Sequence, residues 1–558
     1  MLRRIVYVVM TLMLVMAVVG CSKPKAEGPR ELVIGTLQEP DRLSPLFLQM
    51  VSAAQVVRGP VALYLFQMDD KGGFEPTLLK ETPSEENGGI KLLPGGKMEV
   101  SYRLREGLKW SDGKEITAED YVFTHKLIMD LALPVPSRTL HSDMETVEAT
   151  DKYTIKVVYR AVQPFPCHWW HLILPKHYYE PIYEEYKNSG APDYGVKFAA
   201  DKRVNVGYVT NGPYIVKEWT PGDKVVLERN PNYNVSATPK IGTVIFKILP
   251  DAGALKANIL AGTVHMAAEA GLPLTMIIEG ESKGEFSNRT VMYTPTFSFY
   301  HLQMVLDKPP LNDATVRRAL LTAIDREAIA KQLFGGKLKV ADTWYPPGHY
   351  AYTEDVAKYP YDLEKAKKLL SDAGWKTGKD GKLYKGDTPL SIKLIAVSGD
   401  LLYEQLEQLI AGYWSDVGVQ VTIENEPAKA FFGETFKKVD EPGAVLLWSW
   451  SLDYENLGKQ WLTEEIPTAE NNWVGQNFCN WSNPENDRLL EMAKAELDQG
   501  KRAEVLAQQQ LLWTTELPDL PLLYRVKVTI VPKNLSGVSP APFGYIGWNI
   551  AQWAWQTQ

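Results

Sequence analysis

The chain has 558 residues, of which 45% are hydrophobic and 23% charged, and this length and balance predict a globular protein of two or more lobes. The 68 acidic residues outnumber the 60 lysines and arginines, so the net charge of -8 argues against a nucleic-acid-binding protein. Three cysteines exclude a disulfide scaffold. The 16 tryptophans and 27 tyrosines are a high aromatic content, and aromatic side chains are favoured where a protein binds a ligand.

The first 20 residues have the composition of an export signal. Arg3 and Arg4 precede an apolar or small stretch from Ile5 to Gly20. A membrane-spanning helix needs roughly 20 apolar residues, so this stretch is short for a span and fits a signal peptide better. We therefore predict a signal peptide over residues 1–20.

The end of this stretch, Val18-Val19-Gly20-Cys21, resembles the bacterial lipobox. The resemblance implies cleavage before Cys21 and its modification with diacylglycerol; a signal anchor with an incidental cysteine is the alternative. Residues 21–30 are polar and are predicted to form a tether. The mature chain keeps 58 basic and 68 acidic residues, a net charge of -10. Attachment through a basic patch is therefore excluded, and acyl chains would hold the chain on the outer side of the membrane.

Strands and helices alternate in the predicted order of the first half. A strand is expected over residues 31–36, and the prolines of residues 38–45 end it. A half-buried strand is expected over 98–104. Thr117 and Asp120 have the spacing of a capping box and open a helix that runs to Leu131. Further strands are predicted at residues 154–159 and 225–228.

Helices with recognisable caps follow. Asn312-Asp313 opens one through Ala323, and Asp325 caps a second that Gly335-Gly336 ends. Residues 363–374 carry apolar side chains at i, i+3, i+4 and i+7, which predicts an amphipathic surface helix. The chain has no fixed-period repeat, and the mixture of elements predicts an α/β or α+β protein.

Five segments match a known family in their residues and order: 102–120, 211–214, 229–233, 316–320 with 325–326, and 361–375. The residues themselves indicate mainly structural roles: Gly107 and Gly113 suit turns, and Trp110 suits a core. The segments resemble the solute-binding proteins of bacterial ABC importers for oligopeptides, dipeptides, nickel complexes and some oligosaccharides, known as family 5. The resemblance implies an α/β, two-lobe periplasmic-binding-protein fold of type II with an extra subdomain inserted in the first lobe.

The resemblance also implies a division of the chain. After the signal peptide and the tether, it assigns residues 31–50 to lobe I, 51–205 to the inserted subdomain, 206–296 to lobe I, 297–521 to lobe II, and 522–558 to a return to lobe I.

The candidate ligand-binding residues come from the same resemblance. Trp450-Ser451-Leu452-Asp453-Tyr454 is similar to the family's Trp-x-x-Asp-Tyr pattern, in which the carboxylate meets the free amine of a peptide. This implies that Asp453 pairs with a cationic end group, although on residue type alone it would cap a turn. Glu39 resembles a second acidic position of the pocket. Trp448 shares a strand face with Trp450 and either packs in the core or lines the cleft. The candidate set is Asp453, Trp450, Tyr454, Glu39, Trp448, Ser451 and Lys438.

One departure from the family concerns the peptide carboxylate. Some oligopeptide binders have an arginine three residues before the matching tryptophan, where this chain has Leu447, and no arginine occurs from Val419 to Asn486. Lys438 lies near another basic position, but an ammonium is a weaker carboxylate clamp than a guanidinium. Nine of the 16 tryptophans fall between Trp448 and Trp555, so an oligosaccharide ligand is the main alternative.

Other chemistries have weaker signals. Cys167, His168, His171 and His177 could together suggest a metal site, although their aromatic neighbours favour packing. The chain has no Gly-x-Ser-x-Gly, His-Glu-x-x-His, Walker or Gly-x-Gly-x-x-Gly motif. We therefore predict a non-enzymatic, monomeric receptor without cofactor or resident metal, whose partners are a peptide-like solute and the permease and ATPase subunits of an ABC importer. An adhesin or chemosensor with the same fold remains a further alternative.

Overall fold

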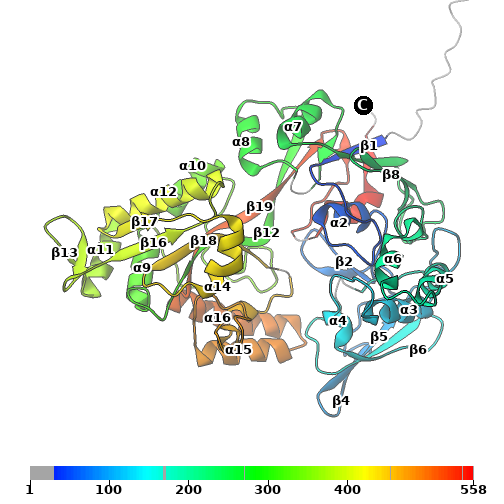
Figure 1. Cartoon of the computed structure of the whole chain (residues 1–558), viewed down its shortest axis with the longest axis horizontal. Coiled ribbons are helices and arrows are strands. Elements are labelled where there is room, and N and C mark those ends of the chain that lie inside the picture. The colour runs from blue at the N-terminus through cyan, green and yellow to red at the C-terminus, as the bar shows by residue number, and fades with distance from the viewer. Residues whose placement is uncertain (1–30, 168–170, 269–270, 453, 543, 557–558) are drawn as a thin grey trace, which may run out of the picture.

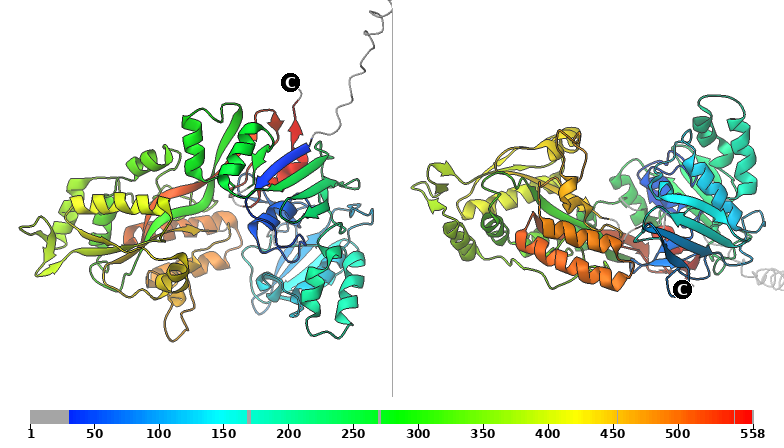
Figure 2. Two further views of the ribbon diagram at one scale, coloured as in Figure 1. Left: turned by 45° about the horizontal axis from the view of Figure 1, so that its top comes forward. Right: turned by 90° about the horizontal axis from the view of Figure 1, so that it is seen from below.

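The computed structural model describes residues 31–167, 171–268, 271–452, 454–542 and 544–556. These residues form two halves that lie side by side in every view (Figures 1 and 2). One half holds the chain from its blue start to the green helices α7 (Ala252–Ala261) and α8 (Leu274–Ser282), together with its red end, and the other holds the part that follows, through yellow to orange. The two-lobe α/β fold predicted from the sequence is confirmed. Among the described helices, none is long and apolar enough to cross a membrane.

The first half contains two sheets. A five-stranded sheet has the order β11-β1-β10-β9-β8, in which β1 runs parallel to β10 and β11. A four-stranded antiparallel sheet has the order β4-β5-β7-β6. Each sheet packs on its own buried cluster of apolar side chains. The strands are β1 (Glu31–Thr36), β4 (Ile90–Leu93), β5 (Lys97–Arg103), β6 (Met144–Ala149), β7 (Thr154–Tyr159), β8 (Tyr214–Thr220), β9 (Lys224–Arg229), β10 (Thr243–Ile248) and β11 (Met266–Ala267), and a hairpin joins β2 (Phe66–Met68) to β3 (Phe74–Pro76).

The predicted capping box opens the main helix of the four-stranded sheet. The Asp120 carboxylate accepts hydrogen bonds from the backbone N–H of Thr117 and from the indole of Trp110, which is 1% exposed. Gly107 and Gly113 have φ of +75° and +87°, a conformation that favours glycine. The helices of this half are α2 (Val51–Val57), α3 (Ala118–Met129), α4 (Thr139–Ser142), α5 (Lys176–Lys187), α6 (Tyr194–Ala200), α7 (Ala252–Ala261) and α8 (Leu274–Ser282).

The second half is built on a five-stranded sheet of order β17-β16-β18-β12-β19. Its strands are β12 (Arg289–Met304), β16 (Ser391–Ile395), β17 (Gln420–Ile423), β18 (Ala444–Ser451) and β19 (Asp519–Pro532); a separate three-stranded sheet comprises β13 (Lys376–Thr377), β14 (Leu383–Lys385) and β15 (Thr388–Pro389). The predicted caps Asp313 and Asp325 are confirmed at α9 and α10, and Asp362 caps α11. The helices are α9 (Ala314–Thr322), α10 (Arg326–Phe334), α11 (Leu363–Asp372), α12 (Leu401–Asp416), α13 (Ala428–Ala430), α14 (Phe436–Lys438), α15 (Pro484–Ala495) and α16 (Gln499–Glu516).

Two long strands, β12 and β19, connect the halves. They pair antiparallel from Arg289↔Pro532 to Gln303↔Asp519. One end of this ladder packs on the first half, where Ile530 joins the cluster around Leu255. The other end lies in the main core of the second half, where Leu302 is fully buried. The two strands are therefore a shared element on which both halves are built (Figure 1).

A second contact between the halves lies at the start of α16. Arg502 donates a hydrogen bond to the carbonyl of Pro164 at 2.8 Å, and its guanidinium lies 4.5 Å from the ring centre of Phe165. Nearby, Phe74 of the first half packs against Tyr454 of the second, with ring centres 5.1 Å apart. The two halves therefore touch away from the connecting strands as well. The predicted limits of the inserted subdomain, residues 51–205, stay a prediction.

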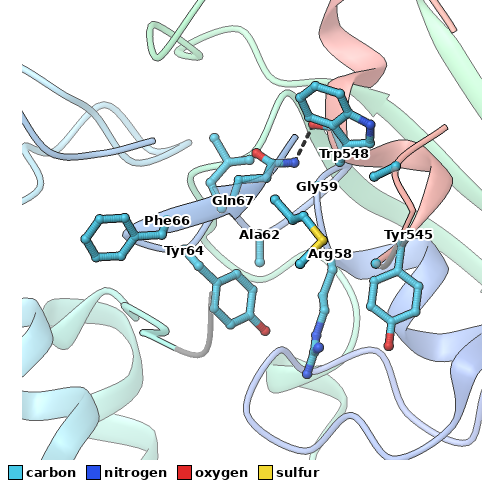
Figure 3. A pocket seen from close by; sticks show the side chains of 12 residues that line it. Arg58, Gly59, Ala62, Tyr64, Phe66, Gln67, Tyr545 and Trp548 are labelled. Atoms are coloured by element: carbon cyan, nitrogen blue, oxygen red, sulfur yellow. Dashed lines mark hydrogen bonds between the residues drawn. The ribbon is translucent and has the colours of Figure 1, made fainter. Parts of the chain in front are cut away.

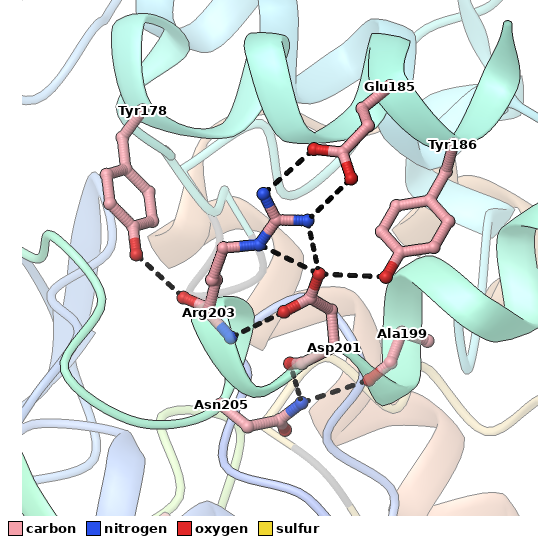
Figure 4. Close-up of polar contacts among 7 residues, drawn as sticks. All are labelled: Tyr178, Glu185, Tyr186, Ala199, Asp201, Arg203 and Asn205. Carbon is pink, nitrogen blue, oxygen red and sulfur yellow. Dashed lines mark hydrogen bonds and ion pairs between the residues drawn. The ribbon is translucent and has the colours of Figure 1, made fainter. Parts of the chain in front are cut away.

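A polar network holds the loop that follows β1 against α5 and α6 (Figure 4). Asn205 is 7% exposed; its Oδ1 accepts from the N–H groups of Leu43 and Ser44, and its Nδ2 donates to the carbonyls of Ala199 and Asp201. The outer part of the network is more exposed. There Arg203 pairs with Glu185 and Asp201, with 45% of its side chain accessible.

We predict that Asn205→Ala lowers the free energy of unfolding by about 2 to 4 kcal/mol, because it leaves buried backbone groups without partners. The matched control is Arg203→Met, which removes the exposed ion pairs of the same network and should change stability much less. Urea unfolding followed by tryptophan fluorescence measures both. Equal effects of the two variants would contradict this account of the anchor.

Candidate functional site

Two cavities lie beside the junction of the halves. The large cavity has a volume of about 820 Å³, and its wall comes mostly from the first half. The crossover cavity has a volume of about 440 Å³ and follows β12 and β19. Both volumes suit a small ligand. The large cavity is lined from within residues 45–64, 128–143 and 163–165 and by Leu172, Glu455 and Tyr545; the crossover cavity is lined from within 267–277, 296–298 and 525–530 and by Leu37, Ser451 and Ile546.

One short segment reaches both cavities. Ser451 ends β18 and lines the crossover cavity, and Glu455 lines the large cavity. Leu452 and Tyr454 pack in the core of the second half, whereas most of the facing wall belongs to the first. Asp453, the predicted partner of a ligand amine, stands between these residues in the sequence and lies outside the described residues.

The large cavity has a small annex with a cationic and aromatic wall. The annex, of about 40 Å³, shares Arg58, Tyr64 and Tyr545 with the large cavity. The Arg58 guanidinium lies 5.6 Å from the ring centre of Tyr64 and 5.5 Å from that of Tyr545 (Figure 3). Gln67 donates a hydrogen bond to the carbonyl of Trp548 at 2.5 Å and holds the C-terminal segment against β2. Cation–π contacts of this kind fix the position of an arginine side chain.

The face of β18 that carries the two predicted tryptophans is packed. The ring centres of Trp448 and Trp450 are 4.7 Å apart, and the Trp448 ring lies 5.8 Å from Phe436. The Trp448 indole donates to the side-chain oxygen of Gln303 at 3.0 Å, and the residue is 9% exposed. Neither tryptophan lines the large cavity or the crossover cavity. The structure therefore brings the two rings together as predicted, in an aromatic cluster of the second half.

The opposite face of β18 carries hydroxyl groups. The Ser451 hydroxyl lies 3.1 Å from that of Ser298, its neighbour on β12. Two residues earlier, Ser449 accepts a hydrogen bond from Arg525 of β19 at 3.0 Å. Arg525 lines the crossover cavity and was not predicted from the sequence. No local motif marks it, because its position depends on the pairing of strands that are about 200 residues apart.

Tyr454 is held firmly in the second half. Its ring packs against Phe74, His349 and Tyr350, and its hydroxyl accepts from the Gln499 amide at 2.6 Å. Its carbonyl accepts from His349 Nε2 at 3.0 Å, while His349 Nδ1 accepts from the N–H of Ala351. Tyr454 is 6% exposed. These contacts anchor the segment between the cavities.

Two predicted residues lie apart from this segment. The Glu39 carboxylate accepts from the N–H of Gly222 at 2.9 Å, in the β8–β9 turn of the first half. Lys438 is exposed on α14, where it pairs with Glu434 and lies 5.6 Å from the ring centre of Trp473. Neither side chain lines the large cavity or the crossover cavity.

The residues of the possible metal site have other partners. His171 is fully buried and lies 2.6 Å from the Tyr121 hydroxyl and 3.0 Å from the Pro166 carbonyl, and burial lowers its pKa to about 4. His177 pairs with Asp112 at 2.8 Å. Cys167 and Cys479 are free thiols. His168 lies outside the described residues, and the described ones include no group of three or more histidine, cysteine or acidic side chains placed to hold a metal.

A pH prediction follows from His349. Burial lowers its pKa to about 3, well below the value near 6.5 of an unfolded chain. Between these values the unfolded chain binds the extra proton, so the contribution of His349 to stability is lost as the pH falls from about 6.5 toward 3. The free energy of unfolding should fall when the pH is lowered from 7 to 4.5, and His349→Gln should make this fall smaller by about 2 to 3 kcal/mol. Urea unfolding at both pH values measures this, and an unchanged pH dependence would contradict it.

Known proteins resemble this chain over nearly its whole length. It is 26% identical to the oligopeptide-binding protein AppA of Bacillus subtilis over 554 residues, which cover 96% of this chain and 93% of that protein. It is 26% identical to the probable deoxycholate-binding periplasmic protein YgiS of Escherichia coli, with 89% of each chain covered. Among solved structures, the oligopeptide-binding protein of Thermus thermophilus complexed with a pentapeptide matches with a TM-score of 0.67, 25% identity and coverage of 95% of this chain and 97% of that one.

The part of the chain that matches a known family includes the connecting strand β12 and residues 451–455. The family model for the bacterial extracellular solute-binding proteins, family 5 middle region, matches residues 95–461 of this chain. This chain belongs to the family 5 bacterial extracellular solute-binding proteins.

Proposed function

We propose that this protein is the substrate receptor of an ABC importer, which captures a peptide-like solute between its two halves and delivers it to the permease. The observation that carries the proposal is the segment from Ser451 to Glu455, which belongs to one half and reaches two cavities walled largely by the other. A solute that contacts this segment and the facing wall together stabilises the closed arrangement over an open one. ATP hydrolysis belongs to the partner ATPase subunits, and the receptor leaves its ligand chemically unchanged.

A peptide is favoured over the alternatives by the chemistry of the cleft. Asp453 offers a carboxylate to a free amine, and extended backbone can be held by main-chain hydrogen bonds whatever its side chains. An oligosaccharide would need exposed indole faces, whereas Trp448 is buried against Phe436 and Gln303. A metal complex would need ligands that the described histidines, such as His171, already use for other contacts. The similarity to peptide-binding relatives supports the same choice.

Native mass spectrometry of the purified chain tests the ligand class. We expect the mature protein to retain masses of peptides, and Asp453→Asn to retain at least tenfold less, because an amine would lose its charge partner in a desolvated cleft. The matched control is Asp416→Asn, an exposed aspartate at the end of α12, which should retain as much as the wild type. A retained sugar or a stoichiometric metal ion would contradict the peptide proposal, and equal retention by all three proteins would remove Asp453 from the site.

We also propose that the mature chain is a monomer held on the extracytoplasmic side of the membrane by acyl chains on Cys21. The sequence around Cys21 supports this, because a short apolar stretch ends directly before it and a polar tether follows.

The full chain expressed in a bacterium should incorporate an alkyne-labelled fatty acid and fractionate with membranes. Cys21→Ser should lose the label and the membrane attachment, because no acyl acceptor remains at the cleavage position. Cys167→Ser, which alters a thiol of the folded part, is the control and should behave as the wild type. Labelling of Cys21→Ser would contradict the assignment.

A further inference from the structure

We propose that Arg525 binds a free carboxylate of the solute in the crossover cavity, so that this protein prefers peptides with an unblocked C-terminus. This inference rests on the proposed function and adds to it a specificity-determining residue. It concerns a position to which the sequence pattern assigned no role. Leu447 occupies the position where some relatives have an arginine for the peptide carboxylate. It is fully buried in the core of the second half, so this position cannot contact a carboxylate here.

The backbone aims Arg525 at the cavity through an irregularity in the connecting ladder. Pairing runs from Pro295↔Val526 to Phe299↔Tyr524, so three residues of β12 stand opposite Arg525 alone. Such bulges re-aim side chains beside functional sites. Two of the three residues, Thr296 and Ser298, line the crossover cavity together with Arg525, and Thr296 also donates to the Arg525 carbonyl at 3.1 Å. The bulge therefore gathers two hydroxyl groups and one guanidinium at the place where the halves join.

Among the described residues, the partners of the Arg525 guanidinium are uncharged. Its Nη1 donates to the neutral hydroxyl of Ser449, and its Cζ lies 5.3 Å from the ring centre of Tyr300. Burial raises the pKa of Tyr300, so this phenol stays uncharged at neutral pH. Within the described part of the chain, no carboxylate forms an ion pair with Arg525. Arg525 itself is half-buried. A half-buried arginine oriented by neutral partners is prepared to receive an anion from outside.

The surroundings suit a carboxylate in particular. The charged residues among the described lining of the crossover cavity are Arg525 and Lys527. The rest of its polar lining consists of the hydroxyl residues Thr296, Ser298, Ser451 and Thr529. A guanidinium can present two parallel N–H donors to the two oxygens of a carboxylate. The volume of about 440 Å³ accommodates the end of a peptide and not a long chain.

The place of Asp453 in the chain suits a ligand with both charges. Ser451 lines the same cavity as Arg525, and Asp453, the proposed partner of an amine, follows only two residues later, at most about 7 Å of extended chain. A short peptide with a free amine and a free carboxylate is therefore the ligand that this inference and the proposed function together favour.

Competition between two tripeptide mixtures tests the inference. Both mixtures are randomised at each position without aspartate or glutamate, and one has free C-termini while the other has C-terminal amides. Each is offered to ligand-stripped protein, and the retained peptides are weighed by mass spectrometry. We expect the wild type to retain free acids at least tenfold over amides and Arg525→Met to retain the two equally. Arg488→Met removes an exposed arginine of α15, outside both cavities, and should keep the wild-type preference.

The outcomes separate this inference from the proposed function. Retention of neither mixture by the wild type would contradict peptide binding and the inference with it. Retention of both mixtures equally by the wild type would overturn the inference and leave peptide binding standing. A preference for free acids that survives in Arg525→Met would place the carboxylate elsewhere and also overturn it. Arg525→Lys keeps the charge without the two-pronged donor and should show an intermediate preference; it serves as the test should the methionine variant not fold.

Discussion

The paired strands β12 and β19 are the constraint on which the rest of the structure depends. Their ladder is rooted at one end in apolar contacts of the first half and at the other in the main core of the second. Because backbone hydrogen bonds run along both strands, one continuous ladder joins the two halves. The bulge between Pro295 and Phe299 interrupts this ladder at the junction.

The same strands explain why the cleft has two differently built parts. The crossover cavity follows the bulge and carries hydroxyls and two cations among an otherwise apolar lining, whereas the large cavity lies against the loops of the first half and includes the carboxylates Asp143 and Glu455. Ser451 lies at the crossover cavity and Glu455 at the large cavity, because β18 ends beside the bulge and the contacts of Tyr454 hold the chain that follows. A solute bound there would contact a well-packed part of the second half on one side and the cavity wall of the first half on the other. This is the arrangement that binding-driven closure requires.

Much of the fold could be predicted from the sequence, because its signals are local. The Thr117 and Asp120 capping box, the Asp313 and Asp325 caps and the alternation of residues 98–104 each specify an element by neighbouring residues, and the structure confirms them. The site was harder to predict. Alternation placed Trp448 and Trp450 on one face correctly. It could not distinguish a face packed in the core from a face that lines the cleft, because that depends on contacts with Phe436 and Phe478. Arg525 was missed because a bulge in strand pairing, not a motif, gives it its position.

Small-angle X-ray scattering tests the central claim, that the two halves close on a solute, most directly. The radius of gyration of the ligand-stripped chain should fall when the unblocked tripeptide mixture is added, because a bound peptide stabilises contacts between the halves across the cleft. The amidated mixture serves as the comparison at the same concentration. An unchanged radius of gyration in a sample shown by mass spectrometry to be saturated with peptide would contradict the account.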